Sequence, residues 1–202
     1  MVEGQRIILI GVVEESRERI TFKLLKEIFA ILNYDVIYEN KAESMIVLWK
    51  ECKTLIVMDI KPGIISSIED IGIDFDIILH TFLNIKDYEN KSLKTIFSKA
   101  KYIIVNCDEE KWNLLLNDNI KSILITYGFN NKATVNPSSY NNQDLMEAVI
   151  CFQREVETMD GNVIEPFEFP IRIDTEKKLD IYSVIAIVVC GLVLGEKIHK
   201  NC

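Results

Sequence analysis

The chain has 202 residues, is 49% hydrophobic and carries a formal net charge of -8. This length can bury one sizeable core, so we expect a single domain over residues 1–202. The acidic balance excludes the basic surface that nucleic-acid binding requires, and no nucleic-acid partner is expected. Five scattered cysteines without a CxxC pair argue against a disulfide framework and a zinc site, and favour a reducing cytoplasm.

The N-terminal residues MVEGQR lead into a strand-like segment without the basic and apolar regions of a secretory signal. We therefore expect a cytoplasmic protein. The abundance of Ile, Lys and Asn is typical of an AT-rich bacterial genome, which is a compositional association only.

Five short apolar runs, rich in β-branched residues and without helical periodicity, predict strands that are buried on both faces. They cover residues 6–10, 54–59, 75–81, 102–106 and 122–127. Helical patterns lie between them, at about residues 20–32, 93–100 and 109–117. This alternation predicts an α/β fold, with a mostly parallel sheet and helices on both of its faces.

The pattern changes after Gly128. Short segments and a turn at Met159–Asn162 predict a small antiparallel β portion near residues 130–173. The run IYSVIAIVVCGLVLG, residues 181–195, is almost wholly apolar. It is shorter than the roughly 20 residues that a helix needs to cross a bilayer, so we favour a buried core helix over a C-terminal membrane anchor and expect no membrane partner.

Polar residues follow the predicted strands at the edge where open parallel sheets bind ligands. These strand ends are marked by Gly11, Asp59, Thr81, Asn106 and Asp108. The carboxylates of Asp59 and Asp108 are of the kind that Mg²⁺ prefers. The alternative is that each caps the turn or helix that follows it, and we favour this alternative for each residue taken alone.

The segment LIGVVEESRERIT, residues 9–21, joins the first predicted strand to the first predicted helix. Many α/β proteins hold a phosphate at such a junction. If Gly11 opens a phosphate loop, the spacing places Ser16 at the second glycine and Arg17 at the lysine. Glu18 then stands where the loop needs Ser or Thr, so only the framework of the loop is present.

The same turn carries acidic residues that would oppose a bound polyphosphate. Glu14, Glu15 and Glu18 would surround it, and two like charges ~4 Å apart cost about 4 kcal/mol at an effective dielectric near 20. A carboxylate can instead occupy the positive end of the helix itself, with Ser16 as N-cap. We favour this self-capped turn over a nucleotide site.

Five segments of the chain, in order, resemble the central, ATP-binding domain of the Mur ligases. They are TLIVMDIKPG, FDIILHTFLNI, YIIVNCDEEKWNLLL, ILITYGFNNKATVNPSSY and LDIYSVIAIVVCGLVLG. The resemblance spans roughly residues 6–195 and implies a P-loop-type topology. It also implies an ancestral site for Mg-ATP, in which Asp59 stands at the family's magnesium-binding Glu.

The chain departs from the family at the residues that carry the chemistry. The family's Gly-Thr-Asn-Gly-Lys-Thr loop reads GVVEESRER, without the Lys and the hydroxyl that follows it. The Thr-Asn-Leu-x-x-Asp-His motif has lost its Asn and His at residues 81–87, and Leu179 and Asp180 replace the His-Asn pair of the last helix. The chain also resembles only the middle one of the family's three domains.

The resemblance and its departures lead to a short list of site residues. We expect no catalytic residue and no bound cofactor. Residual Mg-ATP binding would involve Asp59 as the metal ligand and a degenerate nucleotide site, for which the candidates are Gly11, Ser16, Arg17, Asn106 and Asp108.

Three functions stay open. The leading hypothesis is a catalytically inactive Mur-ligase-like domain that acts by binding or regulation, through an unidentified protein partner linked to cell-wall peptide ligation. The second is an ATP- and Mg-binding component of an ATP-dependent peptide ligase that another chain completes. The third is an acidic scaffold or homodimer without a ligand.

Overall fold

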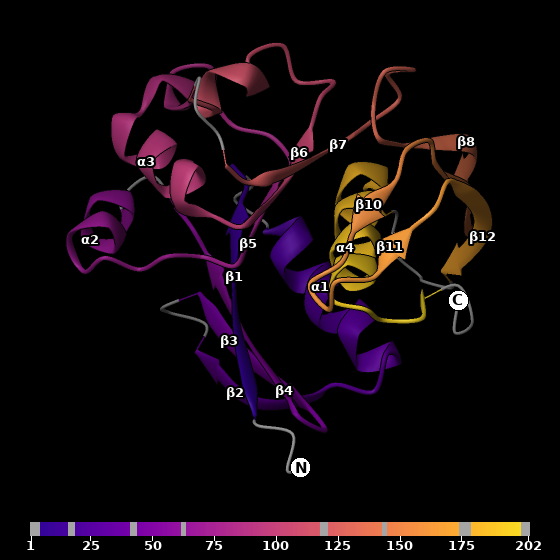
Figure 1. Ribbon diagram of the computed structural model, residues 1–202, viewed down its shortest axis with the longest axis horizontal. Coiled ribbons are helices and arrows are strands. Elements are labelled where there is room, and N and C mark those ends of the chain that lie inside the picture. Colours follow the sequence, from indigo (N-terminus) through magenta and orange to yellow (C-terminus); the bar gives the residue numbers. More distant parts are fainter. Residues whose placement is uncertain are drawn as a thin grey trace.

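A ten-stranded mixed sheet runs through the part of the chain that the computed structural model describes (Figure 1). That part comprises residues 5–15, 19–40, 44–61, 64–117, 121–142, 145–173 and 179–198. The strand order is β12-β9-β8-β7-β6-β5-β1-β4-β3-β2. Its parallel centre consists of β4 (Lys53–Asp59), β1 (Arg6–Val13), β5 (Ile77–His80), β6 (Tyr102–Asn106) and β7 (Ile123–Tyr127).

Antiparallel strands extend the sheet at both ends. Beyond β7 lies β8 (Val135–Asn142), which pairs with β7 in parallel and is followed by the antiparallel β9 (Met146–Phe152) and β12 (Phe167–Ile173). Beyond β4 lie the antiparallel β3 (Met45–Lys50) and β2 (Asp35–Asn40). A separate two-stranded sheet pairs β10 (Val156–Glu157) with β11 (Val163–Ile164). Together these elements confirm the predicted mostly parallel α/β fold with a small antiparallel portion.

Helices cover both faces of the sheet (Figure 1). One face carries α1 (Ile20–Ile31) and α4 (Ile181–Val193), and the other carries α2 (Ile65–Asp70) and α3 (Lys91–Lys99). Two 3₁₀ turns, η2 (Asp87–Glu89) and η3 (Trp112–Leu115), lie on the side of α3. Each face therefore has its own apolar core, as the alternating pattern predicts.

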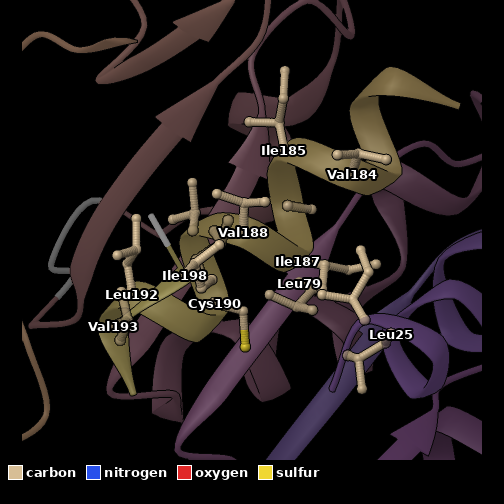
Figure 2. Packing of buried hydrophobic residues seen from close by; sticks show 14 of the residues in the cluster. Leu25, Leu79, Val184, Ile185, Ile187, Val188, Cys190, Leu192, Val193 and Ile198 are labelled. Atoms are coloured by element: carbon tan, nitrogen blue, oxygen red, sulfur yellow. The ribbon is translucent and has the colours of Figure 1, made fainter. Parts of the chain in front are cut away.

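Helix α4 forms the centre of the larger core (Figure 2). All of its residues except Tyr182 are buried, because the helix carries apolar side chains on every side and packs inside the core. Ile187 lies near Leu25 of α1 and Leu79 of β5 in Figure 2, so α4 packs against both a helix and the sheet. The prediction of a buried core helix is thus confirmed. No helix within the described ranges is both long and apolar enough to cross a membrane.

Five features differ from the prediction or were not predicted. β1 continues to Val13 instead of ending at residue 10. The expected helix at 109–117 is only the short η3, in which Leu115 is the buried residue. The β2–β3 hairpin and α2 were not predicted, because the β2 side chains are almost all exposed and α2 has only six residues. Strands β8, β9 and β12 continue the main sheet, so only β10 and β11 form a separate one.

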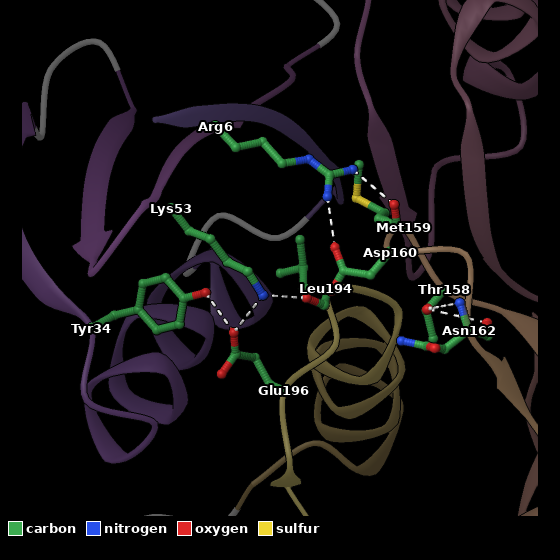
Figure 3. A network of polar contacts seen from close by, with 9 residues as sticks. All are labelled: Arg6, Tyr34, Lys53, Thr158, Met159, Asp160, Asn162, Leu194 and Glu196. Carbon is green, nitrogen blue, oxygen red and sulfur yellow. Dashed lines mark hydrogen bonds and ion pairs between the residues drawn. The ribbon is translucent and has the colours of Figure 1, made fainter. Parts of the chain in front are cut away.

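A polar network closes the amino edge of the parallel strands, where α4 ends (Figure 3). Glu196 is 8% exposed and accepts hydrogen bonds from Tyr34 Oη at 2.8 Å and Lys50 Nζ at 2.6 Å. Lys53 Nζ donates to the Leu194 carbonyl at 2.6 Å and lies 3.2 Å from Glu196. Burial alone would raise the pKa of Glu196, but these donors outweigh burial and lower it.

A second contact ties the small sheet to the same edge. Arg6, the first residue of β1, donates to Asp160 Oδ1 at 2.7 Å and to the Met159 carbonyl at 2.9 Å (Figure 3). Both acceptors lie in the turn between β10 and β11, where the sequence predicts one. The turn is therefore anchored to the start of the central strand.

Candidate functional site

The N-terminus of α1 is closed by a carboxylate of the chain itself. Glu14 follows β1 and is 3% exposed. Its Oε2 accepts a hydrogen bond from the backbone N–H of Thr21 at 3.0 Å, and its Oε1 accepts one from Phe22 at 2.9 Å. These are first-turn N–H groups of the kind that bind phosphate in α/β proteins. Glu14 thus occupies the anion position of this helix.

The surroundings of Glu14 favour the protonated form of its carboxyl group more than water does. Burial raises the pKa of Glu14, and the two backbone hydrogen bonds oppose that shift. The nearby carboxylate of Asp59 raises the pKa of Glu14 a little further. A polyphosphate at this helix end would therefore meet a carboxylate whose negative charge is only partly compensated by hydrogen bonds.

The N-termini of α1 and α4 are connected through buried hydroxyl groups. Thr21 Oγ1 and Ser183 Oγ lie 2.8 Å apart, and Ser183 Oγ donates to Asp180 Oδ2 at 2.6 Å. The same Asp180 oxygen accepts the backbone N–H of Ser183, which makes Asp180 the N-cap of α4. Asp180, which the sequence resemblance matches to the Asn of a His-Asn pair, serves as a helix cap in this structure.

Asp59, the predicted metal ligand, ends β4 and is 1% exposed. Its Oδ2 lies 3.3 Å from Arg19 Nε and 3.8 Å from Lys61 Nζ. Burial raises the pKa of Asp59, while the charges of Lys61 and Arg19 lower it. Two cationic side chains therefore lie where a metal ion would have to approach this carboxylate.

Oδ2 of Asp59 makes no hydrogen bond with the described part of the chain, although it is buried. Such an oxygen retains the capacity to accept a donor or a cation. The described residues hold no cluster of three or more His, Cys, Asp or Glu side chains that could bind a metal ion. A magnesium ion at Asp59 would therefore depend on water and substrate oxygens for most of its ligands, and it would lie beside the positive charges of Arg19 and Lys61.

Asn106 and Asp108 organise the loops at the ends of β6 and β7. Asn106 Nδ2 donates to the Thr81 carbonyl at 2.9 Å, and Asn106 Oδ1 accepts the N–H of Asp108 at 3.0 Å. Asp108 accepts the N–H groups of Phe129 at 2.6 Å and Asn130 at 3.0 Å. Both side chains therefore have structural partners, in agreement with the alternative that they cap turns.

Asp108 also fixes the residues around it. Tyr182 Oη donates to Asp108 at 3.1 Å, and burial together with this carboxylate raises the pKa of Tyr182 to about 12. Gly128 has a φ of 146° and lies so close to Asp108 that a Cβ would stand 2.7 Å from its carboxylate. A glycine is required at this point of the loop.

Gly11 lies inside β1 and not in the turn that follows it. It pairs with Met58 of β4 and Ile78 of β5. A Cβ at Gly11 would stand 2.5 Å from Ile60 Cδ1 and 3.1 Å from Phe75 Cδ1. The glycine therefore allows close packing of the sheet against these side chains, and it lies within β1 and not at the strand end where the sequence placed it.

Ser16 and Arg17, the remaining predicted nucleotide-site residues, lie outside the described residues, as does Glu18. The N-cap position of α1 belongs to Arg19, which has a φ of 51° and makes no side-chain capping hydrogen bond. The prediction of Ser16 as N-cap is therefore wrong. The acceptors come from Glu14, because this carboxylate reaches the first-turn N–H groups from the end of β1.

A buried histidine at the end of β5 was not predicted as a site residue. His80 is fully buried, and its Nε2 lies 3.1 Å from Tyr88 Oη, which donates to Glu109 Oε2 at 3.1 Å. Burial lowers the pKa of His80 to about 3, so the imidazole is neutral. Nε2 then carries the proton given to Tyr88, and Nδ1 is left without a partner among the described residues.

The structure also contains a hollow away from this edge, on the antiparallel strands β8, β9 and β12. It measures about 500 Å³ and is lined by Ser139, Tyr140, Asn141, Glu147, Ala148, Val149, Pro170, Ile171 and Arg172. None of the predicted site residues lines it. The sequence offered no signal for it, since the hollow depends on how side chains of three strands are arranged in space.

Comparison with known proteins supports the resemblance at the level of the fold. No protein-family model and no curated protein sequence matches this chain. Its structure is similar to that of a UDP-N-acetylmuramoyl-L-alanyl-D-glutamate--2,6-diaminopimelate ligase, with a TM-score of 0.64 and 11% sequence identity. The match covers 96% of this chain and 44% of the ligase, so the chain spans less than half the length of that protein. The chain therefore has the fold of a Mur ligase domain.

Proposed function

We propose that this chain is a catalytically inactive Mur-ligase-like domain that acts by binding a protein partner. The observation that carries the proposal is the Glu14 carboxylate on the N–H groups of Thr21 and Phe22. Phosphoryl transfer depends on positioning the phosphates and neutralising their charge. A buried carboxylate at the phosphate-binding end of α1 opposes both.

The surroundings of Asp59 support the same proposal. A magnesium ion would have to displace Arg19 and Lys61, which lie 3.3 Å and 3.8 Å from Oδ2. The exchange gains little, because two cationic side chains already lie beside this carboxylate and lower its pKa. The surroundings of Asp59 do not fit Mg-ATP, and we assign no chemical step to a bound nucleotide.

Isothermal titration with Mg-ATP tests this proposal. We expect no saturable heat at nucleotide concentrations up to about 1 mM, which corresponds to a binding free energy weaker than about -4 kcal/mol. A micromolar dissociation constant would contradict the proposal. Glu14→Ala provides the causal test, because it exposes the first-turn N–H groups and should bind polyphosphate more tightly than the matched control Glu15→Ala.

The second candidate function is a nucleotide-binding component of a peptide ligase that another chain completes. The buried, incompletely satisfied Oδ2 of Asp59 at the end of β4 favours it. It predicts ATP hydrolysis that a partner chain stimulates and that Asp59→Ala abolishes. Hydrolysis that stays at the buffer rate in the presence of a partner would exclude this function.

The link to cell-wall peptide ligation rests on the similarity to the diaminopimelate-adding ligase, and we propose it for the partner as well. Affinity measurements against purified cell-wall peptide ligases test it. Saturable binding to one of them, retained in Glu15→Ala, supports the link. Absence of binding to all of them would place the partner elsewhere.

A further inference from the structure

We propose that the hollow on strands β8, β9 and β12 binds a free α-amino acid with a large apolar side chain. Glu147 of β9 would accept hydrogen bonds from the ammonium group of the ligand, and Arg172 of β12 would donate to its carboxylate. The hollow lies away from the carboxyl edge of the parallel strands, so this inference does not rest on the proposed function.

The hollow lies on the face of the three strands that points away from α4. Tyr140, Ala148 and Ile171 pair across the strands as one row, and the side chains of Ala148 and Ile171 are buried in the core that contains α4. Because successive residues of a strand point to opposite faces, the rows before and after this one point away from α4. The backbone of the middle row therefore forms the floor of the hollow.

The two neighbouring rows of side chains form the walls of the hollow. The first row consists of Ser139, Val149 and Pro170, and the second consists of Asn141, Glu147 and Arg172. Residues two apart in a strand are separated by about 7 Å, and three strands span about 10 Å. The hollow has a volume of about 500 Å³, which is in the size range of small-molecule sites. It is therefore a short trough with one largely apolar wall and one charged wall.

The charged wall keeps its capacity to bind a ligand. Arg172 Nε lies 3.8 Å from Glu147 Oε1, which is close enough for an ion pair but too long for a hydrogen bond. The side chains of Arg172 and Glu147 are 71% and 53% exposed, so their attraction for each other contributes little to stability. The guanidinium N–H groups and the carboxylate oxygens can therefore turn to a ligand at little cost.

The order of the two charges identifies the class of the ligand. Glu147 and Arg172 pair directly across β9 and β12, where Cβ atoms are about 5 Å apart. An anion that approaches Arg172 is repelled by Glu147, and a cation that approaches Glu147 is repelled by Arg172. An α-amino acid carries an ammonium group and a carboxylate on the same carbon atom at neutral pH, so it pairs with both side chains at once.

The opposite wall selects the side chain of the ligand. Val149 and Pro170 precede or follow the charged residues by two positions on the same strands, so they face them across the floor at about 7 Å. A side chain of the size of leucine reaches these apolar residues when the charged groups of the ligand lie at Glu147 and Arg172. Its removal from water adds to the binding free energy. Glycine and alanine lack this contribution.

An NMR titration of the full chain with L-leucine tests the proposal. Because both charged contacts are exposed, we expect a dissociation constant on the order of 1 mM. The amide resonances of Ala148 and Ile171 in the floor should shift saturably, whereas those of Thr21 and Phe22 at the N-terminus of α1 should stay in place. The proposal is overturned if Ala148 and Ile171 show no saturable shift up to about 10 mM leucine.

Two analogues of leucine separate the contacts of the two charges. Leucinamide lacks the carboxylate, and N-acetyl-leucine lacks the ammonium group. Each analogue should bind at least about fivefold more weakly than leucine. An affinity equal to that of leucine for either analogue would contradict the assignment of a ligand with both charges.

Variants of the two charged residues assign each contact. Arg172→Gln and Glu147→Gln should each weaken leucine binding at least about fivefold. Glu147→Gln should also bind N-acetyl-leucine no more weakly than leucine, because the contact with the ammonium group is absent in both cases. Glu168→Gln is the matched control, since Glu168 is exposed on the same face of β12 beyond Pro170, and it should bind leucine like the wild type.

Unchanged leucine affinity in Arg172→Gln or Glu147→Gln would overturn the proposal, as would an equal loss in Glu168→Gln. None of these measurements involves a nucleotide or a partner protein. Their failure is therefore separate from a failure of the proposed function.

Discussion

Helices α1 and α4 pack against each other, and carboxylates of the protein lie at both ends of the pair. The two ends differ in the direction in which the surroundings shift the pKa of the carboxylate. At the N-termini, Glu14 and Asp180 accept the first-turn N–H groups. At the C-terminal end, Glu196 accepts from Tyr34 and Lys50. The pKa of Glu14 is raised by burial, whereas donors lower the pKa of Glu196 despite its burial.

This difference distinguishes a network that stabilises the fold from a pair of buried carboxylates at the carboxyl edge of the parallel strands. Glu196 has enough cationic partners to favour its charge, which is typical of a contact that holds a fold together. Glu14 and Asp59 are buried with raised pKa values at the edge where α/β sheets bind ligands, and perturbed carboxylates cluster at such functional sites. Under the proposed function, side chains of the chain itself fill the edge where α/β sheets bind ligands.

The largest effect is expected from breaking the network at the C-terminal end. Glu196→Ala leaves Tyr34 Oη and Lys50 Nζ without their acceptor in a buried place, and we expect a loss of about 3 kcal/mol in the free energy of unfolding. Urea denaturation measures it. Asp160→Ala, which removes the exposed ion pair with Arg6, should cost no more than about 1 kcal/mol. Equal losses in the two variants would contradict the ranking.

Glu14→Ala should have the next largest effect. It leaves the backbone N–H groups of Thr21 and Phe22 without their acceptor, which costs about 2 kcal/mol. Added phosphate or ATP should recover part of this stability, because the helix end is then open to an anion. A thermal-shift series with and without these anions measures both effects. A loss that anions do not recover would argue against an anion position at α1.

Gly11→Ala tests the packing role of this glycine. The new Cβ would stand 2.5 Å from Ile60 Cδ1, and we expect overpacking to cost about 1 kcal/mol. Ile60→Val removes that methyl group, so the double variant should recover part of the loss. If the two substitutions are additive in denaturation experiments, the contact with Ile60 is not the cause.

The smallest expected effect is a difference in pH dependence. The folded-state pKa of Glu14 is above its ordinary value of 4.5, so its contribution to stability is full below that value and is lost as pH rises through the raised pKa. Glu196 has a lowered pKa, so its contribution is present above 4.5 and is lost as pH falls through the lowered pKa.

Denaturation curves of Glu14→Gln and Glu196→Gln between mild acid and neutral pH measure this difference. Relative to the wild type, Glu14→Gln should lose stability on acidification from neutral pH, because only the wild type gains from protonation of Glu14. Glu196→Gln should approach the wild type as pH falls below 4.5. Parallel curves for both variants would remove the electrostatic contrast between the two helix ends.

Much of the fold could be predicted because buried strands and helices carry a strong hydrophobic signal. The five parallel strands were predicted from apolar runs, and α4 from a run that is apolar on every side. β2 escaped prediction because it has no buried face, so its side chains follow no period. η3 was predicted as a longer helix, since apolar residues on a short turn resemble the start of a helical stripe.

The site could be predicted only in part. Asp59, Asn106 and Asp108 stand at strand ends as expected, because parallel strands end at one edge. Their partners are contacts between segments distant in the chain, such as Asp108 with Phe129, which no local pattern encodes. The acidic turn after β1 did indicate that a carboxylate could take the helix end. It did not show which of the acidic residues would do so.

The most direct test follows the amide resonances of Thr21 and Phe22 by NMR while Mg-ATP is added. If Glu14 holds these N–H groups, both resonances stay in place up to about 1 mM nucleotide in the wild type and move in Glu14→Ala. Saturable shifts of the two wild-type resonances with a micromolar dissociation constant would show that nucleotide displaces Glu14, and the account of a closed site would be wrong.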